Sequence, residues 1–69
     1  MTQITVSTEQ YTAQVQIERK ENPTRFVFVA SCKGFTFASG TKRAETLEEA
    51  VEEIAWMVRY SMDTSLPRN

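Results

Sequence analysis

Arg25-Phe26-Val27-Phe28-Val29-Ala30-Ser31 (residues 25–31) is the stretch that decides the fold. Its interior is aromatic, β-branched or small and offers no polar face, which predicts a strand in the middle of a sheet. Asn22-Pro23 predicts a turn before it, because proline fixes φ and disfavours helical backbone in the preceding residue. Residues 31–34 predict a tight turn after it, since Gly34 can adopt positive φ.

Strand patterns flank this stretch on both sides. From Tyr11 to Glu18 apolar and polar residues alternate, which predicts a half-buried strand with one wet face. Phe35 to Ser39 predicts a third strand. Because the connections are short, neighbouring strands must be antiparallel and form a meander over residues 11–41. Residues 1–10 are predicted to be an N-terminal segment in which Ile4 and Val6 extend the first strand or form a short strand of their own.

A helix is predicted over residues 46–62. Thr46 is its N-cap and Glu49 follows three residues later, which is the capping-box pattern. The glutamates of the first two turns suit the positive end of the helix dipole. The helical period places one apolar stripe toward the sheet: Leu47, Ala50, Val51, Ile54, Val58 and Ser61, with Ala55, Met57 and Met62 at its edges.

These elements predict one small α+β domain over residues 1–69, a three-stranded antiparallel meander with one C-terminal helix packed on one face (βββα). Residues 63–69, which include Pro67, are predicted to be a flexible tail.

The composition argues against catalysis. The chain has no histidine, the commonest general base and metal ligand near neutral pH. Cys32 is the only cysteine and has Lys33 beside it, but no partner base that would make it a nucleophile. No glycine-rich phosphate loop is present. We therefore expect a protein that is not an enzyme and uses no cofactor or metal.

Charge and hydropathy limit the partners. A lone cysteine without secretory features predicts a reducing cytoplasmic setting, and no apolar run approaches the ~20 residues of a membrane helix. The net charge of −1 is segregated, with most basic residues before position 44 and five glutamates within residues 45–53. This dipolar pattern differs from the broad basic field of a nucleic-acid binder. We expect a protein partner, and neither a membrane nor a nucleic acid.

Two aromatic residues give the sharpest functional hypothesis. Trp56 falls opposite Leu47 on the helical wheel, and Tyr60 is its i+4 neighbour on that outer face. An aromatic pair within a charged rim is typical of an interface hot spot, and the rim residues are Glu49, Glu52, Glu53 and Arg59. The alternatives are that residues 1–10 or the tail fold over these rings, or that the rings stand partly exposed with no role.

The predicted sheet has apolar residues on both faces, but only one helix is available to cover them. A single helix covers one face, so either the phenylalanines or the valines of residues 26–29 must lie on the other. A homodimer or a partner would cover such a face, through Phe26, Phe28, Phe35 and Phe37. The alternative is that residues 1–10 cross over it.

The passage into the helix resembles two families. Tyr11, residues 26–30 and Thr46-Leu47-Glu48-Glu49-Ala50 look like the β-β-β-α half of the HicB-like antitoxin domain, although its proline-glycine-cysteine element before the helix is absent. Residues 44–50, followed by Trp56 and Tyr60, look like the T7-type phage inhibitor of bacterial RNA polymerase. That family places functional arginines on a further strand, so those contacts are not carried over.

These resemblances imply a phage or mobile-element inhibitor, similar in size to anti-CRISPR proteins, that occludes a surface of a host protein in the host cytoplasm. An antitoxin module that neutralises a toxin is the first alternative. The second is a small nucleic-acid-binding domain that uses the basic strand ends.

Overall fold

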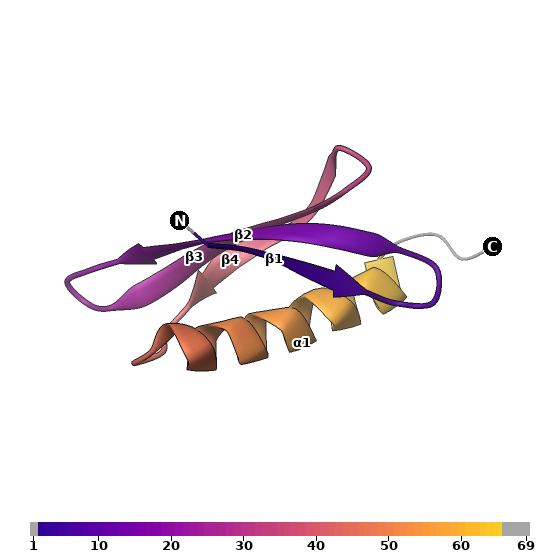
Figure 1. The fold of residues 1–69 in the computed structure, drawn as a ribbon. Coiled ribbons are helices and arrows are strands. Elements are labelled where there is room, and N and C mark those ends of the chain that lie inside the picture. Colours follow the sequence, from indigo (N-terminus) through magenta and orange to yellow (C-terminus); the bar gives the residue numbers. More distant parts are fainter. Residues whose placement is uncertain (1, 66–69) are drawn as a thin grey trace.

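The computed structural model, which describes residues 2–65, contains one four-stranded antiparallel sheet and one helix that covers a single face of it (Figure 1). The strands are β1 (Thr2–Ser7), β2 (Thr12–Lys20), β3 (Arg25–Cys32) and β4 (Phe35–Lys42), and the helix α1 spans Leu47–Ser65. Each strand pairs with the next in the chain, in the order β1-β2-β3-β4. The α+β class, the antiparallel sheet and the C-terminal helix are confirmed.

The prediction of three strands is wrong, because residues 2–7 form a fourth strand along the edge of β2. Ile4 lies opposite Val15 and Val6 lies opposite Ala13. Thr8 closes the connecting turn, since its amide donates to the carbonyl of Tyr11 at 2.8 Å. Two apolar residues in six are too weak a pattern to predict a strand alone. The pairing with β2 supplies the stability that the local sequence lacks.

The core lies between the helix and one face of the sheet. Phe26 and Phe28 of β3 are 0% and 4% exposed, and they meet the helix residues Ile54 and Val58 in one buried cluster. The other buried members are Val6, Ala13, Val15, Ile17, Ala30, Ala50 and Met62. β3 lies between β2 and β4, as its unbroken apolar pattern predicted.

The helix starts at the predicted position but ends later. It continues to Ser65, so Asp63 and Thr64 are helical and not part of a tail. Leu47 is 40% exposed, because it stands at the first helical position, beyond the main contact with the sheet. Met62, expected at the edge of the apolar stripe, is 2% exposed. The rest of the predicted tail, including Pro67, lies outside the described residues.

The second face of the sheet is open and mainly polar. Val27 and Val29 lie there, while Phe26 and Phe28 lie beneath the helix, so those two phenylalanines are not available for an intermolecular contact. The other open-face positions are Gln3, Thr5, Ser7, Thr12, Gln14, Gln16, Glu18, Lys20, Arg25, Ser31, Thr36, Ser39 and Thr41. The hypothesis of an aromatic open face is therefore wrong. Residues 2–7 do not cross this face either; they extend its edge.

Phe35 and Phe37 are placed by the β3–β4 hairpin. Lys33 and Gly34 form its two-residue turn with φ of 51° and 79°, the positive values that such tight hairpins require. A register shift at Ala30/Ser31 adds a β-bulge in β4. Phe37 is half-buried and packs against the core, whereas Phe35 beside the turn is 64% exposed.

Candidate protein-binding surface on helix α1

Trp56 and Tyr60 project from the outer side of α1. Their side chains are 67% and 61% exposed, whereas Ile54 and Val58 on the inner side are fully buried. The helical period accounts for this contrast, because residues four apart share a face and Trp56 lies about half a turn from the buried stripe. Among the described residues, neither the β1 strand nor the end of the helix covers these rings.

The two rings stack on each other. Their centroids are 6.0 Å apart and their planes are inclined by only 6°. Offset parallel rings at this distance attract each other, which favours one arrangement of the pair before any partner arrives. We call Trp56 and Tyr60 the aromatic pair. It presents a broad apolar surface with two hydrogen-bonding groups, the indole N–H and the phenol hydroxyl.

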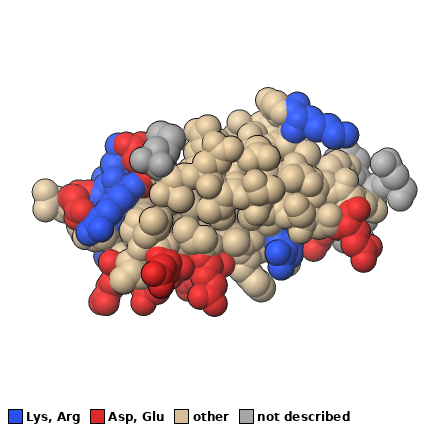
Figure 2. All heavy atoms as spheres, viewed as in Figure 1, with Lys and Arg blue, Asp and Glu red and all other residues tan. Residues whose placement is uncertain are grey.

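Carboxylates gather on the N-terminal half of the helix beside the aromatic pair. Glu52 and Glu53 are exposed, and both line a shallow hollow together with Lys42, Trp56 and Met57. In Figure 2 the acidic atoms form a cluster along this part of α1, on the side of the molecule opposite the sheet. The surface next to the pair is therefore negative.

Lys42, the last residue of β4, forms an ion pair with Glu53 on this surface. Its Nζ lies 3.3 Å from Oε2 of Glu53, and the two side chains are 33% and 53% exposed. Partly exposed pairs of this kind contribute at most about 1 kcal/mol to stability. The pair lies in the hollow that Trp56 also lines. Lys42 was not predicted as part of the site, because it lies eleven positions from Glu53 in the sequence and only the β4 register brings it close.

Glu49 stabilises the start of the helix. Its amide donates to Oγ1 of Thr46 at 3.2 Å, and its Oε2 accepts from the amide of Glu45 at 3.3 Å. The N-cap role of Thr46 is confirmed, with the reciprocal bond made one residue earlier than in a standard capping box. A substitution of Glu49 would therefore change helix stability as well as surface charge.

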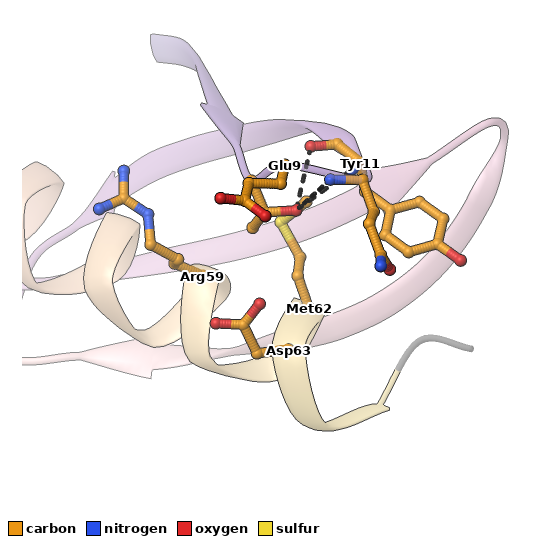
Figure 3. A pocket seen from close by; sticks show the side chains of 7 residues that line it. Glu9, Tyr11, Arg59, Met62 and Asp63 are labelled. Carbon is orange, nitrogen blue, oxygen red and sulfur yellow. Dashed lines mark hydrogen bonds between the residues drawn. The ribbon is translucent and has the colours of Figure 1, made fainter. Parts of the chain in front are cut away.

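Arg59 lines a second hollow, between the β1–β2 turn and the end of α1. The other lining residues are Thr8, Glu9, Gln10, Tyr11, Met62 and Asp63 (Figure 3). The hydroxyl of Thr8 shapes its rim by accepting from the amides of Gln10 and Tyr11 at 3.3 and 3.1 Å. Neither Trp56 nor Tyr60 lines this hollow.

The basic residues around the β2–β3 turn are held by local partners. Nε of Arg19 lies 2.7 Å from Glu21, and Nζ of Lys20 lies 3.0 Å from Glu18. Arg25 donates to the backbone carbonyls of Glu21 and Pro23 at 3.0 Å. Such pairing lowers the net positive field of this end of the sheet.

The described residues offer little support for metal binding, cysteine chemistry or membrane insertion. Within residues 2–65, no three acidic, cysteine or histidine side chains come together as a metal site. Cys32 is buried on the core side of β3. No helix in this part of the chain has the length and apolar character to cross a membrane.

Comparison of the chain with protein-family models, curated proteins and solved structures finds no match.

Proposed function

We propose that this domain is a non-enzymatic protein-binding module that works as an inhibitor by covering a surface of its partner. The observation that carries the proposal is the stacked, exposed aromatic pair on the outer side of α1. Tryptophan and tyrosine are the residues most enriched among those that dominate binding energy at interfaces. Two of them held parallel on a rigid helix lose little side-chain entropy on binding.

The chemistry of this surface defines the partner. The aromatic pair fits an apolar cleft, and the neighbouring carboxylates of Glu52 and Glu53 favour lysine or arginine around that cleft. Complementary charge accelerates the encounter and fixes orientation, while the buried rings supply most of the affinity. The partner is therefore a protein with a basic surface around a hydrophobic depression.

A phage or mobile-element inhibitor of a host protein complex is the form of this proposal that we favour, on the sequence resemblance. An antitoxin would use the same helix surface against a toxin. Nucleic-acid binding is less well supported, because the basic residues Arg19 and Lys20 are paired with glutamates.

The experiment is a comparative affinity capture from bacterial lysate with three immobilised proteins. They are the wild type, the double variant Trp56→Ala/Tyr60→Ala, and Val29→Ala as a control that truncates an exposed apolar residue on the opposite side of the domain. We expect one protein to be retained by the wild type and the control and lost with the double variant. With that protein purified, the double variant should bind at least about 2 kcal/mol more weakly.

Circular dichroism decides how the result is interpreted. The rings are exposed, so the double variant should keep the far-ultraviolet spectrum of the wild type. Equal capture by all three proteins would contradict the proposal, and so would a double variant that unfolds, since the rings would then belong to the fold.

A further inference from the structure

We propose that the free edge of β1 is a self-association surface, at which two copies of this domain pair β1 to β1 in antiparallel orientation around Thr5. The two four-stranded sheets then become one continuous sheet of eight strands. This inference is independent of the proposed function, because it rests on the backbone of β1 and not on the aromatic pair.

The backbone of β1 presents unpaired groups along its outer side. β1 is the terminal strand of the sheet, and no described residue pairs with it on the side away from β2. Thr8 bonds with Tyr11 across the turn, and hydrogen-bonded pairs recur at every second residue of an antiparallel ladder. The amides and carbonyls of Gln3, Thr5 and Ser7 therefore point outward, where only water or another strand can satisfy them.

The sequence of β1 lacks the features that protect an edge. Thr2-Gln3-Ile4-Thr5-Val6-Ser7 contains no charge and no proline, and its register with β2 is unbroken. The opposite edge differs, because β4 carries a bulge and ends at Lys42. Figure 2, seen from the side on which β1 lies in Figure 1, shows a broad uncharged region across the middle of the molecule. The β1 edge is therefore the more regular and less charged of the two free edges among the described residues.

The alternation of outward- and inward-pointing backbone groups along β1 limits how β1 can pair with β1 of a second copy. A twofold axis at Thr5 places Thr5 opposite Thr5 of the second copy, and Gln3 opposite Ser7, so all three outward residues find partners. Ile4 then lies opposite Val6 on the side of the core, and Ile4 is only partly buried in a single copy. An axis at Ile4 would pair Gln3 with Thr5 and would leave Ser7 without a partner among the described residues. A shift by one residue would set polar side chains against the core face.

The helix leaves this edge free. α1 packs beneath the sheet against β1, β3 and β4 and does not extend the plane of the strands (Figure 1). A twofold axis perpendicular to the sheet keeps both helices on the same side of the joined sheet. Two copies can therefore pair without any change in the fold of either.

Proline substitution tests the edge directly. Thr5→Pro removes an outward amide that β2 does not use, and Thr41→Pro does the same on the β4 edge as the matched control. In analytical ultracentrifugation the wild type and Thr41→Pro should sediment as dimers at high concentration. Thr5→Pro should dimerise at least about tenfold more weakly, with an unchanged circular dichroism spectrum.

Charge substitution at Thr5 tests the proposed pairing of Thr5 with Thr5 of the second copy. This test still works if the fold does not tolerate proline at position 5. Thr5→Lys alone and Thr5→Glu alone would each place like charges opposite each other at the axis, so each should be monomeric. An equimolar mixture should form a heterodimer that high salt weakens. A wild type that stays monomeric at every concentration, a Thr5→Pro variant that dimerises normally, or single charge variants that still dimerise would each overturn the proposal. Two monomeric charge variants that fail to associate when mixed would overturn the register at Thr5.

Discussion

Phe28 and Phe35 have the same side chain in opposite environments. Phe28 is 4% exposed and lies opposite Gly40, where an added Cβ would stand 3.4 Å from the phenylalanine ring. Glycine at this position leaves room for the ring beside β4. Phe35 follows the hairpin turn and is 64% exposed. The sequence pattern predicted both residues as contacts on an uncovered sheet face. Each stands in a strand pattern, and hydrophobicity alone does not tell which side chain the helix will cover.

Alanine substitution should separate these two environments. Phe28→Ala should lower the free energy of unfolding by about 3–5 kcal/mol, through lost burial and a cavity. Phe35→Ala, the matched control, should change it by at most about 0.5 kcal/mol. Urea unfolding followed by circular dichroism measures both. A small domain has only ~3–10 kcal/mol to lose, so Phe28→Leu provides a milder variant if Phe28→Ala unfolds. Equal effects at the two positions would contradict the assignment of Phe28 to the core.

The helix combines two roles along its length. Its first turn is fixed by Thr46 and Glu49, while its middle turns carry the core on one side and the aromatic pair on the other. Because Glu49 also holds the amide of Glu45, it is a poor probe of partner contacts. Glu52 has no such bond to the backbone among the described residues and is the cleaner test of the acidic surface.

Removal of the N-cap should destabilise the helix without changing its outer surface. Thr46→Ala should lower the free energy of unfolding by about 0.5–2 kcal/mol, because the amide of Glu49 loses its acceptor. Thr46→Ser keeps the hydroxyl and should stay close to the wild type. The measurement is the urea midpoint of each variant at equal m-value. If serine is as damaging as alanine, the hydroxyl is not what stabilises this helix end.

At the scale of the whole molecule, charge and apolar surface are separated. The carboxylates gather on the first half of α1 (Figure 2), while β1 contains no charged residue. The proposed basic partner would therefore meet the acidic part of α1, and the proposed second copy would meet the β1 edge. In the proposed dimer, two aromatic pairs would stand on the same side of the joined sheet.

Salt should act on the partner complex through the acidic surface. Raising the ionic strength should slow association with the partner more than it changes dissociation, because screening weakens long-range attraction. Glu48→Gln with Glu52→Gln should flatten this salt dependence, since neither side chain makes an ion pair among the described contacts. Surface plasmon resonance at several salt concentrations measures both rates. A salt dependence that the double variant leaves unchanged would mean that other charges steer the encounter.

The sequence by itself determined the features that depend on neighbours along the chain. The apolar run at residues 26–30 defined the interior strand, Thr46 defined the start of the helix, and the 3.6-residue period placed Trp56 and Tyr60 on the outer side. Tertiary structure alone decided the pairing of β1 with β2, the burial of Phe28 under the helix and the approach of Lys42 to Glu53. The reason is physical. Local periodicity sets which side chains share a face, but which face is covered and which edge is paired depend on contacts between residues far apart in the chain.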